Sequence, residues 1–420
     1  NMSGGHRHCG EINHMLKRKP ELLAPAGDLE KMKMAFLYGA DAVYCAGMRY
    51  GLRERATNFS KEQLQEGIDF AHSLHKKVYV TVNAMPHNRD LVDIPEYLGQ
   101  LNQMRVDALI ISDPGVLMLA KQYAPNVEYH LSTQANTVNL ASAKFWQSQG
   151  FSRLILAREL SFEEIREFRE ECQTELECFV HGAMCMAYSG RCLISNFLTG
   201  RDANGGDCAQ ACRWSYSVME KNRSGEYFPV VEDEDGGTAI FYSKDLCMIQ
   251  HIPELMQSGI NGFKIEGRMK SLHYVATVTG VYRQAIDLYW KDPDSYEYQP
   301  QWLEEIQKAG TREFTTGFYF GKPGTSAQNY RGQSVDRSVD FVGVVRESNE
   351  HGIWLEQRNH FKTGDTLEIL LPTMEKVSLV PRTMLNENMD EISIAPHAQM
   401  RVFIPTTHKI PVHSLVRRIK

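Results

Sequence analysis

The sequence predicts an α/β fold: an eight-stranded β/α (TIM-like) barrel with a long cysteine-bearing insertion after strand seven, followed by a small C-terminal all-β barrel. Three observations support this prediction. Eight short β-rich runs alternate with segments whose apolar residues recur at helical spacing, one interval between runs is unusually long, and short alternating strands begin near residue 339. Regular alternation implies parallel strands, and eight units favour a closed barrel over the alternative, an open doubly wound sheet.

The expected barrel elements can be read in order. The strands are "ELLAPAG" from residue 21, "DAVYCAG" from 41, "KVYVTVN" from 77, "DALIISD" from 107, "EYHLSTQ" from 128, "RLILARE" from 153, "ELECFVHG" from 175 and "GFKIEGR" from 262. The expected helices include 29–37, 61–74, 115–123, 141–149, 162–171 and the last barrel helix, 272–290.

The interval between the seventh and eighth strands is the unusual one. It spans about 80 residues and holds five of the nine cysteines. In a β/α barrel the loops that follow the strands form the catalytic face, so an insertion at this position is expected to be functional. The sequence therefore places these cysteines at the mouth of the barrel.

The chain divides into four expected regions. Residues 1–14 are expected to be a disordered tail or a remnant of cloning, and residues 15–320 to form the barrel with its insertion at 182–250. Residues 321–338, rich in Gly, Ser and polar side chains, form a linker. Residues 339–420 contain short alternating runs such as "FVGVVRE", "GIWLEQ" and "MRVFIP", which predict the all-β domain.

The composition is that of a soluble, cytoplasmic protein. Hydrophobic residues make up 42% of the chain and charged residues 23%, and the net charge of −6 gives no argument for a polyanionic partner. No stretch approaches the roughly 18 apolar residues of a membrane span. Nine cysteines is an odd number, and in a reducing compartment they are expected to remain thiols.

Apart from Cys9 in the N-terminal tail, the cysteines fall into two groups. Cys45, Cys172 and Cys178 lie within or beside predicted barrel elements and are expected to be buried core residues. The other five are Cys185, Cys192, Cys208, Cys212 and Cys247. Their Gly-rich flanks lack an apolar period, which favours metal ligation. Four thiolates can hold zinc or an iron–sulfur cluster, and the spacing leans towards a cluster because only Cys208 and Cys212 are as close as a zinc knuckle requires.

Polar residues at the predicted strand ends form a second candidate site. They are Asn83, Gln134, Arg158, His181, Lys264, Glu266, Arg268 and Lys270. Lys264, Arg268 and Lys270 place three cations at one strand end, which suits a dicarboxylate or an RNA phosphate. We expect Lys264 and Arg268 to bind the anion and Glu266 to hold them or move a proton. A salt-bridged rim is the alternative for Arg158 and its neighbour Glu159.

The segment "ECFVHGAMCMAYSGRCLIS", 177–195, resembles the signature of the collagenase-like peptidase family U32. "PELLAPAG", "GADAVY", "LSTQANTVN", "RDANGGDCAQACRW" and "FKIEGRMKS" are also similar to segments of that family. The likeness extends from about residue 20 to 290 and into the C-terminal domain.

The resemblance implies a tRNA-modifying enzyme that hydroxylates the wobble uridine at carbon 5 with prephenate as co-substrate. It implies a 4Fe-4S cluster on Cys185, Cys192, Cys208 and Cys212, with Cys247 as the reserve ligand. It also implies that the tRNA anticodon region is a partner, and some relatives act with a homologous chain.

Two further roles complete the expectation. Arg213 and Trp214, beside the expected cluster, are candidates for phosphate contact and base stacking on RNA. The family name also suggests a peptidase as an alternative, in which His181 could pair with Cys185. The sequence, however, contains neither His-Glu-x-x-His nor Gly-x-Ser-x-Gly. Hydroxylation of another RNA or of an aromatic ring, and a structural zinc module, are the remaining alternatives.

Overall fold

The structure is a computed structural model of the whole chain. It describes residues 18–47, 59–184, 194–199, 209, 244–310, 312–322 and 338–420. The expected tail, most of the insertion and most of the linker therefore lie outside the described residues.

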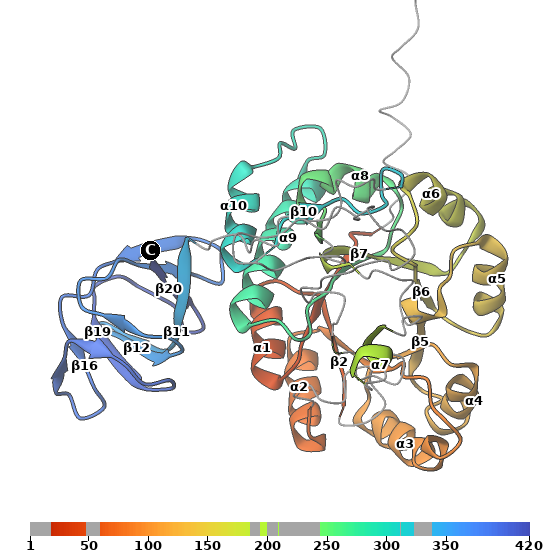
Figure 1. Cartoon of the computed structure of the whole chain (residues 1–420), viewed down its shortest axis with the longest axis horizontal. Coiled ribbons are helices and arrows are strands. Elements are labelled where there is room, and N and C mark those ends of the chain that lie inside the picture. Colours follow the sequence, from red (N-terminus) through yellow and green to blue (C-terminus); the bar gives the residue numbers. More distant parts are fainter. Residues whose placement is uncertain are drawn as a thin grey trace, which may run out of the picture.

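Eight parallel strands close into a barrel, as the sequence predicts (Figure 1). They are β1 (Glu21–Pro25), β2 (Ala42–Cys45), β3 (Lys77–Val82), β4 (Ala108–Ile111), β5 (Glu128–Leu131), β6 (Arg153–Ile155), β7 (Glu175–Ala183) and β9 (Gly262–Ile265). Each strand pairs with the next, and β9 closes the barrel by pairing in parallel with both β7 and β1.

Helices surround the barrel and connect its strands. They are α1 (Leu29–Leu37), α2 (Lys61–Ser73), α3 (Ile94–Met104), α4 (Pro114–Tyr123), α5 (Leu140–Ser148), α6 (Phe162–Glu171), α7 (Ile194–Thr199), α8 (Ile252–Gln257), α9 (Leu272–Lys291) and α10 (Pro300–Ala309). Short 3-10 helices are η2 (Asp90–Val92), η3 (Thr133–Ala135) and η5 (Ile249–His251). Many helices start where the sequence offers a capping side chain: Ser60 and Ser161, for example, each form a capping box. None of the described helices is long and apolar enough to span a bilayer.

An additional pair of strands flanks the barrel at the end of the insertion. β8 (Asp245–Cys247) pairs antiparallel with the last residues of β7, and β10 (Phe314–Thr315) pairs in parallel with β8. The sequence analysis did not predict either strand, because three-residue and two-residue runs carry too little pattern. β8 returns the chain from the insertion to the edge of β7.

The C-terminal region is antiparallel and all-β, as expected. Its main sheet contains β11 (Val339–Asn349), β12 (Gly352–Gln357), β14 (Leu367–Leu370), β15 (Lys376–Leu379), β16 (Met384–Leu385), β17 (Glu391–Ile392), β19 (Arg401–Pro405) and β20 (Leu415–Ile419). A smaller sheet pairs β13 (Phe361–Lys362) with β18 (Ile394–Ala395). Its own core includes Val342, Ile353 and Phe361.

The C-terminal region packs against α1, α9 and α10 of the barrel (Figure 1). Leu370, Met374 and Leu415 join the hydrophobic core of the barrel. The Tyr38 hydroxyl in α1 donates to the carbonyl oxygen of Leu370 at 3.0 Å. This contact is apolar at its centre and hydrogen-bonded at its edge, as in a stable domain interface.

A buried ion cluster crosses the same interface. Arg417 in β20 is fully buried and binds Glu305 of α10, and its Nη2 lies 2.6 Å from Glu368. Lys376 also lies 2.9 Å from Glu305. Burial alone would raise the pKa of Glu305, but Arg417, Lys376 and Lys308 reverse this and lower it to about 2. Glu305 is therefore a charged partner of Arg417 at neutral pH.

Arg417→Met tests this cluster. We expect the free energy of unfolding to fall by about 3–5 kcal/mol, because Glu305 would remain buried with its main partner removed. Equilibrium urea unfolding followed by circular dichroism measures the loss. Arg401→Met is the matched control: Arg401 pairs with Glu347 at the surface, so its loss is expected to cost less than about 1 kcal/mol. Equal losses in the two variants would contradict the prediction.

Candidate active site

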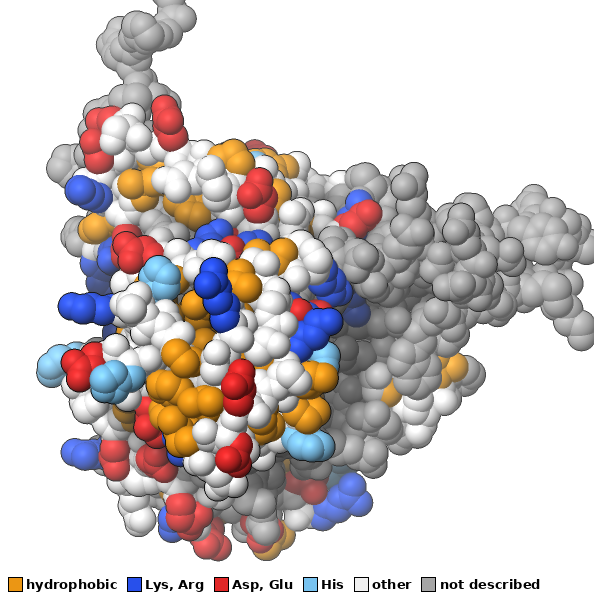
Figure 2. All heavy atoms as spheres, turned by 90° about the vertical axis from the view of Figure 1, so that its left-hand side faces the viewer, with side chains coloured by type: hydrophobic (Ala, Val, Ile, Leu, Met, Phe, Trp, Pro, Cys, Tyr) orange, Lys and Arg blue, Asp and Glu red, His pale blue; other side chains and the backbone are white. Residues whose placement is uncertain are grey.

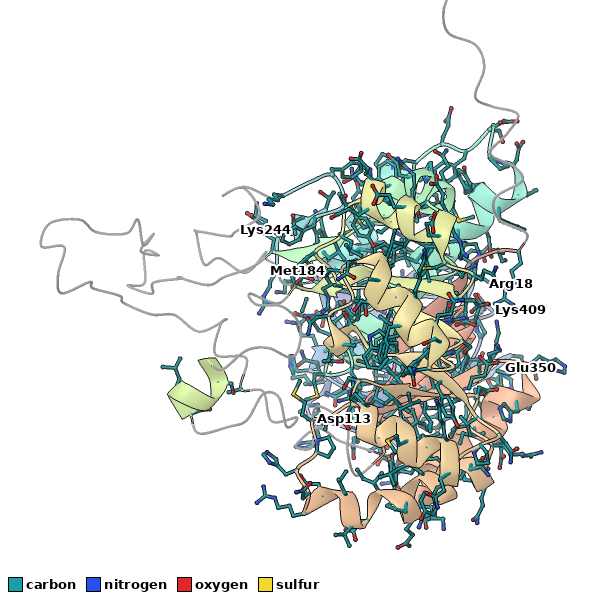
Figure 3. All side chains as sticks on the ribbon, turned by 90° about the vertical axis from the view of Figure 1, so that its right-hand side faces the viewer. Arg18, Asp113, Met184, Lys244, Glu350 and Lys409 are labelled. Carbon is teal, nitrogen blue, oxygen red and sulfur yellow. The ribbon has the colours of Figure 1, made fainter. Side chains whose placement is uncertain are left out.

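The carboxyl ends of the barrel strands and the two described ends of the insertion lie on one side of the molecule. Figure 3 shows Met184, Lys244 and Asp113 on this side, whereas Arg18, which precedes β1, lies on the opposite side. α7 also lies on the side of the strand ends. The insertion therefore leaves and re-enters the barrel at its mouth, where β/α barrels place their active sites.

Below the mouth, a buried arginine organises the barrel interior. Arg153 in β6 is 1% exposed. Its Nη1 donates to Glu21 at 2.6 Å and to Glu177 at 3.0 Å, and its Nη2 donates to Glu175 at 2.7 Å. Burial opposes the charge of Arg153, but Glu21 and Glu177 outweigh burial and raise its pKa above the ordinary value.

Lys264 forms an ion pair with a carboxylate of this arginine–carboxylate cluster. Its Nζ lies 3.3 Å from Glu177 and 4.3 Å from the ring centroid of Tyr44. Burial lowers the pKa of Lys264, and Glu177 offsets only part of that effect. The sequence analysis expected Lys264 to bind an anion at a strand end; the structure places it inside the barrel and already paired with a carboxylate.

Glu266 and Arg158 form the next layer towards the mouth. Arg158 Nη2 lies 3.7 Å from Glu266 Oε2, and the Tyr44 hydroxyl donates to the same carboxylate at 3.3 Å. The Arg158 guanidinium stacks 3.7 Å above the ring of Phe179. Arg158 thus contacts Glu266, which directly follows β9, and its charge also acts on the neighbouring Glu159, whose pKa burial raises and Arg158 lowers.

Arg268 completes the cationic group from the loop after β9. Its side chain donates from Nη1 to the Thr81 hydroxyl at 3.2 Å, and the residue is 6% exposed. A close backbone approach fixes this loop: a Cβ on Gly27 would lie 2.4 Å from the Arg268 carbonyl oxygen. Gly182 allows a second close approach. Its φ is +106°, and a Cβ on this residue would lie 2.4 Å from the Glu266 carbonyl oxygen.

Asn83 and Gln134 come together at another part of the rim. The Asn83 amide nitrogen donates to Gln134 Oε1 at 2.9 Å and to the Ser132 hydroxyl at 3.1 Å. Asn83 is 7% exposed, so this is a buried polar cluster at the ends of β3 and β5. The prediction that these two residues share a site is consistent with this placement.

Two predicted residues face away from the barrel interior. His181 is 1% exposed and packs beside Tyr274, Tyr282 and Phe314. Burial lowers its pKa to about 3. Lys270 lies 3.7 Å from the buried Asp245 of β8. His181 therefore has the surroundings of a neutral core histidine, and Lys270 connects the loop after β9 to the end of the insertion.

The expected cluster ligands Cys185, Cys192, Cys208 and Cys212 lie outside the described residues, as do Arg213 and Trp214. The reserve ligand Cys247 is described. It lies buried in β8 opposite His181, and burial raises its pKa to about 12. Cys247 thus has the surroundings of a core thiol, which the sequence did not predict, whereas Cys45, Cys172 and Cys178 are buried as expected.

The number of thiols between the described ends of the insertion equals the number that a 4Fe-4S cluster takes. Four thiols fall in an insertion whose described ends, Met184 and Lys244, lie at the mouth (Figure 3). A 4Fe-4S cluster takes four thiolates. Among the described residues, no group of three or more His, Cys, Asp or Glu side chains could hold a metal.

The sequence analysis missed several residues of this site. Tyr44, Thr81, Arg153, Glu177 and Phe179 all contact the interior ion pairs. A signal for them was present, because Arg153 and Glu177 are opposite charges in neighbouring apolar strands. Such residues are rarely buried unless they are paired.

The fold and this site define a β/α-barrel protein with a charged, aromatic-lined interior below a cysteine-bearing insertion. The chain belongs to peptidase family U32: the model of that family matches residues 27–329, and the model of the family's C-terminal domain matches residues 337–417.

Curated relatives cover nearly the full chain. It is 42% identical to tRNA hydroxylation protein P1 of Bacillus subtilis, over 97% of this chain and 96% of the relative. It is 40% identical to tRNA hydroxylation protein P of Escherichia coli, over 94% and 95% of the two chains. A 23S rRNA 5-hydroxycytidine synthase of Escherichia coli is 39% identical over 64% of this chain and 39% of the relative.

The burial of His181 predicts a specific pH dependence of stability. The pKa of His181 in the folded protein, about 3, lies below the ordinary value of 6.5. As the pH falls below 6.5, His181 therefore binds a proton in the unfolded chain but not in the folded chain. This term lowers the free energy of unfolding by about 2 kcal/mol between pH 7.5 and pH 5. Urea unfolding of His181→Phe at both pH values should show a decrease smaller by that amount.

The control for this measurement is His351→Gln, because His351 is exposed in the C-terminal region. It should keep the pH dependence of the wild type. If His181→Phe also keeps it, then His181 is not held neutral by the fold.

Proposed function

We propose that this protein is an RNA-hydroxylating enzyme that adds oxygen to carbon 5 of the wobble uridine in tRNA. It uses prephenate as co-substrate and a 4Fe-4S cluster on Cys185, Cys192, Cys208 and Cys212. The observation that carries the proposal is the similarity, over nearly the whole chain, to proteins named for tRNA hydroxylation. The relative named for 5-hydroxycytidine supports a pyrimidine carbon 5 as the target.

The reaction requires a cofactor. Replacing C5–H by C5–OH adds one oxygen atom and removes two electrons from the base, which ordinary side chains cannot accept. A 4Fe-4S cluster on the thiols of the insertion would pass electrons one at a time, and the oxygen atom and the final acceptor of the two electrons would come from a co-reactant. The chain's own contribution is to bind the two substrates, orient them and control protons.

The cationic side of the mouth suits the dicarboxylate co-substrate. Arg158 and Arg268 project from different strand ends, and Lys264 lies beneath them. Charge-assisted hydrogen bonds from guanidinium groups recognise carboxylates strongly, above all where water is partly excluded. In this arrangement Glu266 keeps Arg158 in place in the free enzyme and can take a proton at Oε2 when the substrate arrives.

The described residues offer less support for a peptidase. His181, the histidine that would activate a cysteine, is buried among aromatic rings and is held neutral by the fold. A nucleophile and its base must lie within hydrogen-bond reach of each other. The geometry of His181 therefore favours the hydroxylation proposal.

The far end of the C-terminal region offers little support for an RNA contact, so our proposal has the RNA bind at the mouth. Figure 2 shows acidic, basic and hydrophobic side chains interspersed on that face of the molecule. Phosphate binding draws on clustered Lys and Arg side chains. Arg213 and Trp214 of the insertion remain our candidates for contact with the anticodon loop.

Mass spectrometry of tRNA nucleosides tests the function directly. A host that lacks this protein should regain 5-hydroxyuridine derivatives when it expresses the wild type but not when it expresses Cys185→Ser. Cys172→Ser is the matched control, because Cys172 is a buried thiol that precedes β7, at the opposite end of that strand from the insertion. Full restoration by Cys185→Ser would contradict the cluster, and no restoration by the wild type would contradict the substrate.

Arg268→Gln tests binding of the anionic co-substrate. We expect the KM for prephenate to rise about tenfold to a hundredfold, because the variant loses a charge-assisted hydrogen bond that is worth about 1.5–3 kcal/mol. Steady-state kinetics on an anticodon stem-loop measures the change. Arg166→Gln, an exposed substitution on α6, should leave the KM unchanged. An unchanged KM in Arg268→Gln would remove this residue from the co-substrate site.

A further inference from the structure

The side-chain amide of Asn83 connects the ends of two barrel strands near the mouth. Asn83 directly follows β3, and its side chain reaches past β4 to Ser132 and Gln134, which follow β5. Alternate residues of β3 face the interior: Tyr79 contacts Arg153, and Thr81 accepts a hydrogen bond from Arg268. Asn83 continues that series and is the member nearest the mouth.

The hydrogen bonds of Asn83 fix which way its amide faces. Its nitrogen donates to Ser132 and Gln134, and the Ser132 hydroxyl also donates to Gln134 Oε1. The backbone is held as well, because the Ser112 hydroxyl donates to the Asn83 carbonyl oxygen at 3.1 Å. The side-chain oxygen, Oδ1, is therefore turned away from both neighbours.

No described residue donates a hydrogen bond to Oδ1 of Asn83, although this atom is buried. A buried acceptor without a partner costs about 1–3 kcal/mol, and such groups are rare in folded proteins. An oriented, buried and unpaired acceptor at the mouth of a barrel indicates that a ligand supplies the missing donor.

The charge of the surroundings narrows the kind of ligand. A carbonyl oxygen repels carboxylate and phosphate oxygens, so the anionic groups of a substrate belong with Arg158 and Arg268. Thr81 connects the two regions, since it bonds to Arg268 and lies two residues before Asn83. The mouth thus has a cationic part and a neutral part. In the neutral part, the oxygen of Asn83 lacks a hydrogen-bond donor among the described residues.

We propose that Asn83 Oδ1 accepts a hydrogen bond from the ring N3–H of the target uracil, with Ser132 and Gln134 as positioning residues that hold the amide in this orientation. This inference rests on the proposed function and names the atom of the base that the site reads. Enzymes that act on a base recognise the extruded base through hydrogen bonds to its Watson–Crick edge. N3–H is the donor on that edge of uracil.

A methyl group on N3 tests the contact. We compare hydroxylation of an anticodon stem-loop carrying uridine with one carrying 3-methyluridine at the target position. The wild type should lose about tenfold or more in kcat/KM with the methylated RNA, because the donor is gone and Oδ1 stays unpaired. In Asn83→Ala the methyl group should change kcat/KM by less than about threefold, because the acceptor is absent. The KM for prephenate should stay unchanged in this variant.

Two further variants separate recognition from folding. Asn83→Asp keeps an acceptor oxygen and should retain the sensitivity to N3 methylation. Asn88→Ala alters an exposed asparagine of the same loop and should behave as the wild type. An equal methyl penalty in the wild type and in Asn83→Ala overturns the inference. Failure of the wild type to hydroxylate the unmodified stem-loop overturns the proposed function, and the inference falls with it.

Discussion

The barrel depends on one buried cation. Arg153 is the first residue of β6 and is fully buried, and it neutralises carboxylates from β1 and β7, which otherwise could not be buried together. Burial alone would raise the pKa of Glu177, but Lys264 and Arg153 reverse this and lower it. Removal of one member of such a group leaves an uncompensated buried charge, so the group persists as a unit. It replaces the aliphatic layers that usually fill a β/α barrel.

This charge arrangement propagates upwards to the mouth. Glu177 holds Lys264 from below, and the rings of Tyr44 and Phe179 flank the lysine and the Arg158 guanidinium. Lys264 and Arg158 are therefore each held by neighbouring side chains of the barrel. A preorganised site of this kind loses little free energy to reorganisation when a substrate binds, which is how rigid barrels support catalysis.

The sequence predicted the eight barrel strands because each is a short apolar run between helical segments, and it predicted the polar rim because polar residues follow those runs. It could not predict which side chains face inward. Lys264 and Lys270 look alike in "KIEGRMK", yet one is buried against Glu177 and the other reaches Asp245 outside the barrel. The β7 register shifts between Phe179 and His181, and this bulge turns His181 towards α9. Register and bulges arise from pairing between distant strands, so a local pattern does not contain them.

The two parts of the mouth solve different recognition problems with different physics. Guanidinium groups attract any anion over a distance, which favours capture of a small dicarboxylate but does not distinguish a base. An oriented neutral amide attracts weakly but rejects a partner that lacks the matching donor, because the mismatch leaves a buried oxygen unpaired. Thr81 in β3 lies beside Arg268, and Asn83, which directly follows β3, lies beside Gln134, so one strand fixes the distance between the two parts. In our proposal, binding of the co-substrate and binding of the base can therefore be altered by separate substitutions at the end of one strand.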